Sequence, residues 1–159
     1  MLKDRRTFLQ HFVICLAMIA AFALAWIQGT PQAIFATDVS YTTSVITGLV
    51  AFAAAYMGWQ AWSVDSYVAP FRRDGRRKWR VRLPTAHFGL FAAGLCPLIG
   101  LFGTSTGLRA NISALASGAS GLTPLGTSIV TMQAGVLGAI IILLLLFNLE
   151  SGIRRHEEG

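Results

Sequence analysis

The stretch LGTSIVTMQAGVLGAIIILLLLFN, residues 125–148, decides the fold of this chain. It contains no charged side chain, and it ends in an unbroken apolar run from Ile140 to Phe147. An α-helix needs about 20 consecutive apolar residues to cross a hydrocarbon core roughly 30 Å thick. The sequence therefore predicts a transmembrane helix at about 125–149.

Three further apolar blocks of similar length precede this stretch, at about 8–27, 44–64 and 86–106. Of the 159 residues, 54% are hydrophobic and only 13% are charged, against about 25% charged residues in soluble domains. We therefore predict one all-α integral membrane domain, 1–159, with four transmembrane helices. The first block is longer than the apolar region of a cleaved signal peptide, so we expect it to be retained.

The positions of lysine and arginine predict the topology. All but Arg109 of the 13 basic residues lie in the N-terminal segment, in the loop of about 65–85 or in the C-terminal tail. Short basic segments resist translocation across the membrane. We therefore predict that both termini and this loop are cytoplasmic, and that the two outer loops, 28–43 and 107–124, are nearly uncharged.

The loop of about 65–85 is short and strongly basic. Its basic residues are Arg72, Arg73, Arg76, Arg77, Lys78, Arg80 and Arg82. Clustered arginines beside an aromatic residue such as Trp79 can hold nucleic-acid phosphates, but a position between two spans disfavours nucleic acid. We expect the loop to lie on anionic lipid, each basic residue contributing about 1 kcal/mol, with an acidic cytoplasmic protein as the alternative.

Small residues recur at intervals of three and four along the third and fourth spans. They are Cys96, Gly100, Gly103 and Gly107 in the third span, and Thr127, Thr131, Gly135 and Gly138 in the fourth. Such stripes let helix backbones approach closely in lipid, so we expect these two helices to pack tightly, within a subunit or between subunits. Pro97 removes one helix hydrogen bond in mid-span, which predicts either a packing kink or a pore-lining segment.

Polar and titratable residues are few in the predicted spans. Gln133 carries an amide that needs a partner in hydrocarbon, so we expect it to join helices, with a role in transport as the alternative. His11, His87 and His156 lie at block edges or in the tail, where we expect interfacial or solvated side chains and no metal site. No cofactor site is apparent, and no nucleophile, base and orienting group occur together, so we do not expect an enzyme.

No acidic or basic residue lies well inside any of the four predicted spans. Proton-coupled carriers normally need a titratable group at such a position. A self-contained exporter is therefore disfavoured. If this protein moves protons, the carboxylate has to come from another chain.

Residues 87–108, HFGLFAAGLCPLIGLFGTSTGL, resemble the penultimate helix of the MotA/TolQ/ExbB family of ion-channel subunits, whose core pattern is close to A-P-L-L-G-L-L-G-T-x-x-G. The final span resembles the last helix of that family. The residues in register there are Thr131, Gly135, Ala139, Ile140, Phe147 and Asn148. Four spans with both ends inside is the MotA-like arrangement.

The resemblance implies a homopentamer in the bacterial inner membrane. This pentamer would surround a dimer of a single-span partner resembling ExbD, TolR or MotB, whose aspartate carries the proton while the pentamer turns. Thr104 matches the pore-facing threonine of the family, and Thr131, Thr127 and Gln133 are the other candidates along the ion path. The loop of about 65–85 is far shorter than the domain with which flagellar members grip a rotor, so we expect another envelope process.

Three positions depart from the family pattern. Met132 replaces a second pore threonine, Thr127 stands where a glutamate is frequent, and Ile141 replaces the usual proline. These changes keep a second hypothesis open, in which the chain is a four-helix membrane scaffold or assembly factor that does not conduct ions. Substitution of Thr104 by valine separates the two hypotheses, because a scaffold should tolerate it.

Overall fold

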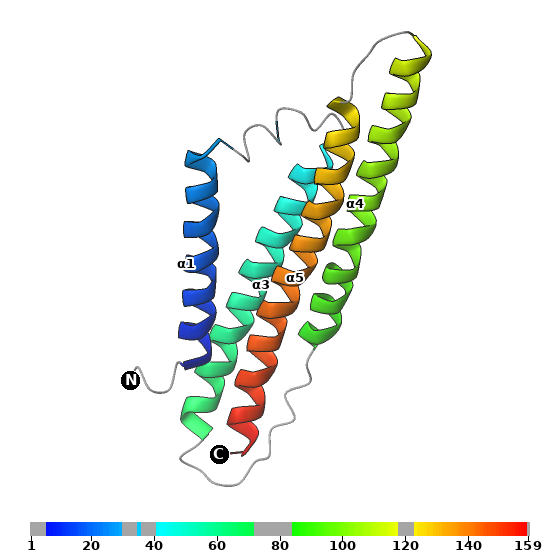
Figure 1. Cartoon of the computed structure of the whole chain (residues 1–159). Coiled ribbons are helices and arrows are strands. Elements are labelled where there is room, and N and C mark those ends of the chain that lie inside the picture. The colour runs from blue at the N-terminus through cyan, green and yellow to red at the C-terminus, as the bar shows by residue number, and fades with distance from the viewer. Residues whose placement is uncertain (1–5, 30–34, 36–40, 72–83, 118–122, 159) are drawn as a thin grey trace.

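A computed structural model describes residues 6–29, 35, 41–71, 84–117 and 123–158. It contains four long helices: α1 (Arg6–Ile27), α3 (Thr42–Phe71), α4 (Pro84–Ala116) and α5 (Thr123–Glu158). Successive helices run in opposite directions (Figure 1). We call the end of the bundle that holds the start of α1 and the C-terminal ends of α3 and α5 the proximal end, and the opposite end the distal end.

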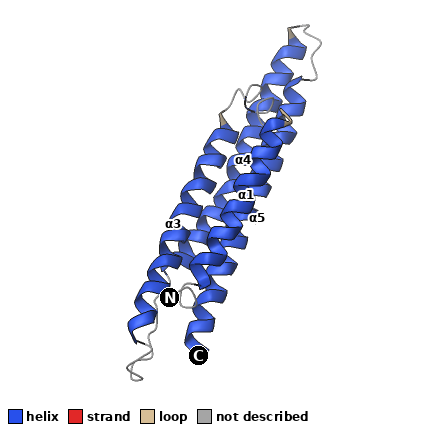
Figure 2. Ribbon diagram, turned by 90° about the vertical axis from the view of Figure 1, so that its left-hand side faces the viewer, coloured by secondary structure: helices blue, strands red, loops and turns tan. Residues whose placement is uncertain are grey.

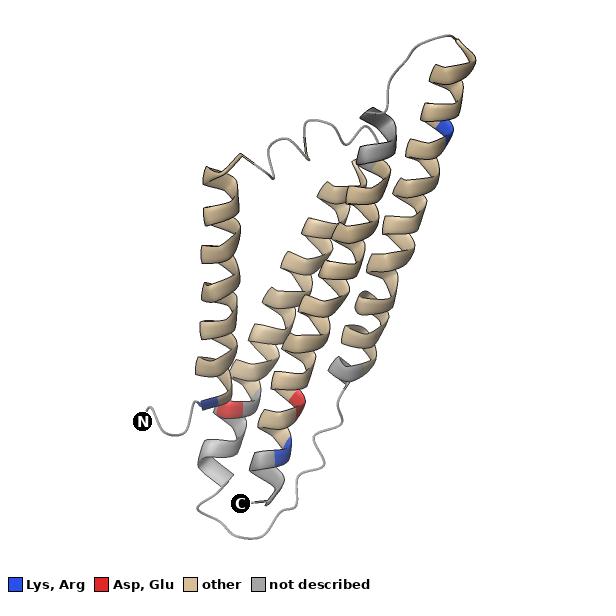
Figure 3. Cartoon of the chain, in the orientation of Figure 1, with Lys and Arg blue, Asp and Glu red and all other residues tan. Residues whose placement is uncertain are grey.

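All four helices are long and apolar enough to cross a membrane, which confirms the predicted all-helical class with four candidate spans. The described charged residues lie toward the ends of the helices, and none lies along their middle (Figure 3). This distribution is expected of a multi-pass membrane protein, because the middle of each span meets hydrocarbon.

The helices are longer than the predicted spans at three places. α3 continues to Phe71, so the first part of the predicted loop of about 65–85 is helical. α5 continues to Glu158 in the predicted tail. α4 continues to Ala116, so the prediction of an outer loop is wrong over residues 107–116. A helix does not need to stop at the hydrocarbon edge, and this segment contains no proline that would end it.

α4 has 33 residues and is therefore about 50 Å long at 1.5 Å per residue. This length exceeds the hydrocarbon thickness of about 30 Å. The C-terminal part of α4 projects past the other helices at the distal end, as both views show (Figures 1 and 2).

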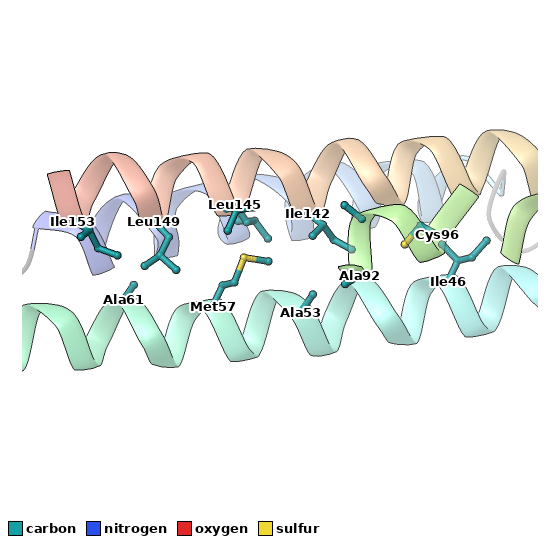
Figure 4. Packing of buried hydrophobic residues seen from close by; sticks show 12 residues of the cluster. Ile46, Ala53, Met57, Ala61, Ala92, Cys96, Ile142, Leu145, Leu149 and Ile153 are labelled. Atoms are coloured by element: carbon teal, nitrogen blue, oxygen red, sulfur yellow. The ribbon is translucent and has the colours of Figure 1, made fainter. Parts of the chain in front are cut away.

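The hydrophobic core lies between α3, α4 and α5 (Figure 4). Its buried residues are Ile46, Ala53, Met57 and Ala61 of α3, Ala92, Ala93 and Cys96 of α4, and Ile142, Leu145, Leu146, Leu149 and Ile153 of α5. Among the described residues α1 contributes none of these; its own buried residues are Thr7 and His11. α1 contacts α3 and α5 but not α4, and it stands apart from α3 toward the distal end (Figure 1).

Candidate functional site

Two glycines bring α4 and α5 into backbone contact. A Cβ atom placed on Gly135 would lie 2.7 Å from the carbonyl oxygen of Cys96 and 3.2 Å from the Cα atoms of Pro97 and Gly100. A Cβ atom on Gly100 would lie 3.0 Å from the carbonyl oxygen of Thr131. Any side chain larger than hydrogen would therefore separate the two helices here.

Two other small residues of the stripes, Gly103 and Gly138, lie against α3. A Cβ atom on Gly103 would lie 2.8 Å from Oγ1 of Thr42, and one on Gly138 would lie 3.0 Å from Cγ2 of Ile46. The tight packing predicted for the third and fourth spans is thus present within one subunit. Gly107 is half-buried on α4.

Three polar residues meet beside the glycine contact. The Thr104 hydroxyl lies 2.9 Å from the carbonyl oxygens of both Gly100 and Ser128, so its single proton is shared between them. The Thr131 hydroxyl donates to the same carbonyl oxygen of Ser128, also at 2.9 Å. We call Gly100, Gly135, Thr104, Ser128 and Thr131 the α4–α5 seam.

The seam brings together two of the three threonines that the sequence analysis placed along the ion path, Thr104 and Thr131. Sequence reasoning did not assign a role to Ser128, although it precedes Thr131 by three residues, which is one helical turn. Ser128 contributes its backbone carbonyl oxygen, which accepts hydrogen bonds from Thr104 of α4 and Thr131 of α5. No pattern of side chains in the sequence predicts such an acceptor.

The chemistry available at the seam is that of neutral oxygen atoms. Both hydroxyl protons are used within the subunit, but each threonine oxygen keeps lone pairs that can accept a hydrogen bond from a donor. Thr131 is only 3% exposed, whereas Thr104 is half-buried, so Thr104 is the residue that a donor outside the helix pair can reach. None of the seam residues is titratable near neutral pH.

The remaining predicted site residues do not join the seam. Gln133 lies on the exposed side of α5 beside Met132. Pro97 lies inside α4 without ending it, at the close approach to Gly135. Thr127 belongs to α5, but its side chain is outside the described residues, as are all seven basic residues of the loop.

Two titratable side chains to which the sequence analysis gave no role in a site are buried near the proximal end. His11 is 3% exposed and Asp65 is 2% exposed, so the expectation of an interfacial or solvated His11 is wrong. The Asp65 carboxylate accepts the backbone N–H of Phe8 at 2.8 Å and thereby caps the start of α1. Thr7, His11 and Cys15 share one helix face at intervals of four, which is the signal that could have placed His11 in an interface.

The outward face of α4 carries a stripe with intervals of three and four residues. Its members are all exposed: Phe91, Gly94, Leu98, Leu101, Ser105, Leu108, Ile112 and Leu115. This spacing of 3.5 residues is typical of helices that pack against another helix. Within the described part of the chain, no helix covers this stripe.

No family model, curated protein or solved structure matches this chain. The resemblance to the MotA/TolQ/ExbB family therefore rests on the residues quoted above. Family membership and function stay predictions.

Proposed function

We propose that this chain is the channel-forming, homopentameric subunit of a bacterial inner-membrane motor driven by the proton-motive force. The observation that carries this proposal is the meeting of Thr104 and Thr131 at one carbonyl oxygen beside the glycine contact of α4 and α5. Thr104 matches the pore-facing threonine of the family, and Thr131 is the hydroxyl nearest to the second pore position, which Met132 occupies here. The seam offers acceptor oxygens and no titratable group, which suits a proton carried by an aspartate of a single-span partner dimer.

The exposed stripe of α4 supports assembly with other helices. Leu108, Ile112 and Leu115 are 47%, 60% and 61% exposed, and they lie beyond the span of about 86–106 that the sequence predicts. Lipid tails can cover an apolar stripe inside the membrane but not beyond it. In the proposed complex neighbouring chains cover the stripe, the proximal end faces the cytoplasm, and the loop residues Arg72 to Arg82 lie on anionic lipid.

The subunit count of the full chain, extracted gently from its own membrane, tests the proposal. We expect native mass spectrometry to find five copies, together with two copies of a single-span protein that has an aspartate near the start of its span. A monomer, or a dimer without any co-purifying chain, would overturn the motor proposal.

One observation favours the second candidate function, a scaffold that does not conduct ions. Both threonine hydroxyls donate inside the subunit, and Thr131 is almost completely buried. In a scaffold these groups only fasten α5 to α4. Such a protein would form a stable assembly, and its membranes would show no proton flux that depends on Thr104.

Three variants of the purified complex separate the two functions. Thr104→Val removes the hydroxyl and Thr104→Ser keeps it. Ser113→Ala is the matched control, because Ser113 lies outside the exposed stripe and its exposed hydroxyl donates to the carbonyl oxygen of Arg109 on its own helix at 3.0 Å. In reconstituted vesicles with a pH-sensitive dye, the motor proposal predicts proton flux that is lost in Thr104→Val and kept in the other two. Flux that is unchanged in Thr104→Val, or absent from the unaltered complex, favours the scaffold.

A further inference from the structure

The imidazole ring of His11 is held between α1 and α3 with one nitrogen satisfied and one not. Its Nε2 atom lies 3.1 Å from the carbonyl oxygen of Ala54. A carbonyl oxygen only accepts hydrogen bonds, so Nε2 carries the proton of the neutral ring and donates it. The Nδ1 atom is then a lone-pair acceptor, and it is buried without a hydrogen-bond partner.

The pocket that holds the ring is built by a glycine of α3. A Cβ atom on Gly58 would lie 3.1 Å from Nε2 and 3.2 Å from Cδ2 of His11. The ring therefore occupies the space that the absent side chain of Gly58 leaves. A satisfied core histidine would have a partner at both nitrogens, whereas here the basic Nδ1 atom is buried without one.

His11 belongs to a set of contacts that fastens α1 to the bundle at the proximal end. Thr7 packs directly on the backbone of Gly152 in α5, where a Cβ atom would lie 2.7 Å from its Oγ1, and Asp65 accepts the N–H of Phe8. We call these contacts, together with that of His11 with Ala54 and Gly58, the α1 clasp.

Beyond the clasp α1 has few protein neighbours. Ile14, Cys15 and Met18 pack partly against the core, but Ile19 is 67% exposed and Ile27 is 81% exposed. The docking of α1 therefore depends on the clasp, since the distal half of the helix adds little contact.

We propose that His11 is a proton-binding site that controls the docking of α1 on α3 and α5. The proton comes from the aqueous phase and binds to Nδ1, which gives an imidazolium with two N–H donors. In the docked position the second donor has no acceptor, and a cation in this buried position is strongly disfavoured. Protonation therefore favours an undocked α1, in which the ring reaches water or lipid headgroups. This inference holds whether or not the chain conducts ions.

The direction of the pH dependence follows from linkage. The docked form binds the proton less well than the undocked form, so docking is fully favoured above about pH 6.5, where a histidine in water is neutral. Docking weakens as the pH falls below that value. The other titratable or charged groups among the described residues near the clasp are Asp65 of α3, Glu150 and Arg154 of α5, and Arg6 and Cys15 of α1.

The reactivity of the two native cysteines measures the docking of α1. Cys15 follows His11 by four residues and is half-buried against the core, whereas Cys96 is 0% exposed within the core. The full chain in lipid nanodiscs is treated with a maleimide between pH 5.5 and 7.5, and labelling of each cysteine is followed by mass spectrometry. Labelling of Cys15 reports undocking of α1, and Cys96 reports the integrity of the bundle.

The key comparison is with His11→Gln, whose amide can still donate to the carbonyl oxygen of Ala54 but cannot be protonated in this range. Because the thiol itself reacts faster at high pH, the ratio of Cys15 labelling rates, unaltered chain over variant, is used at each pH. We expect a ratio of about 1 at pH 7.5 that rises to about 5 at pH 5.5, within the limit of tenfold per pH unit that one proton allows. A ratio that stays constant across this range would overturn the proposal.

Two further variants keep the experiment decisive. His87→Gln changes an exposed histidine at the start of α4, and it should keep the pH response of the unaltered chain. His11→Leu removes the donor, so Cys15 should label fast at every pH; slow labelling in this variant would also overturn the proposal. In the unaltered chain alone, labelling of Cys15 relative to free N-acetylcysteine gives the same test without any substitution at His11.

Discussion

The α4–α5 seam and the α1 clasp hold helices together in different ways. In the seam, Gly100 and Gly135 let two backbones touch near the middle of the helices, beside a core that α3, α4 and α5 share. In the clasp, α1 is fastened within its first two turns by polar side chains and a cap, and it contributes no buried hydrophobic residue to the described core.

This difference shows what drives packing in lipid. Leucine and isoleucine gain little by leaving lipid for a protein surface, so the exposed apolar side chains of α1 cost nothing by themselves. Close backbone approach and satisfied polar groups decide which helices adhere. The seam is therefore the permanent part of the bundle, and α1 is the part whose attachment can change.

Breaking the seam should have the largest effect. In Gly135→Ala the new methyl group would meet the carbonyl oxygen of Cys96, which belongs to the backbone and cannot rotate away. Overpacking lowers the free energy of unfolding by about 1–3 kcal/mol, and we expect a loss at the upper end of this range for Gly135→Ala. Unfolding of the full chain in mixed micelles, followed by circular dichroism against the fraction of denaturing detergent, measures the loss.

Gly138→Ala is the matched variant for Gly135→Ala. Its methyl group would meet the Cγ2 methyl groups of Ile46 and Val50, at 3.0 and 3.1 Å, and a shift of these side chains by a few tenths of an ångström relieves the contact. We expect a loss of about 1 kcal/mol. Equal losses at the two glycines would contradict the view that backbone contact makes the seam different.

The seam was largely predictable from the sequence, because its glycines and threonines repeat with the helical period, and this period is visible along one segment. The clasp was not. Asp65 and Phe8 are 57 residues apart, and His11 and Ala54 are 43 residues apart. A side chain of one helix that caps another helix leaves no local pattern, so the sequence places Asp65 at the start of the loop of about 65–85 and predicts an interfacial or solvated His11.

The length of α4 could not be predicted from the sequence either. Hydropathy reports where hydrocarbon begins and ends, whereas a helix continues until its backbone or a neighbour stops it. Residues 107–116 were therefore assigned to a loop, although they extend α4 and carry Leu108, Ile112 and Leu115 along the same exposed stripe.

Breaking the clasp at Asp65 should have a smaller effect, confined to α1. Asp65→Leu leaves the N–H of Phe8 without its acceptor, and loss of a helix cap costs about 1–2 kcal/mol. We expect maleimide labelling of Cys15 at pH 7.5 to rise about tenfold, since 1.4 kcal/mol corresponds to a factor of ten, while Cys96 stays protected.

Ser63→Ala is the control for Asp65→Leu. It lies on the same helix, and within the described part of the chain its hydroxyl bonds only the carbonyl oxygen of Trp59, at 2.9 Å. We expect no change in the labelling of Cys15. If both variants label at the same rate, Asp65 does not fasten α1.

The smallest expected effect is a gain in stability rather than a loss. It tests whether the contact at a glycine, rather than the glycine itself, makes the seam sensitive to substitution by alanine. Gly48 lies on α3 with no atom within 4 Å of a Cβ atom placed on it. Alanine favours a helix over glycine by up to about 1 kcal/mol, so Gly48→Ala should raise stability by about 0.5 kcal/mol in the same unfolding assay. A loss of stability at Gly48 comparable with that at Gly135 would mean that glycine sensitivity is general in this bundle, and the contrast between the seam and the rest of the molecule would fail.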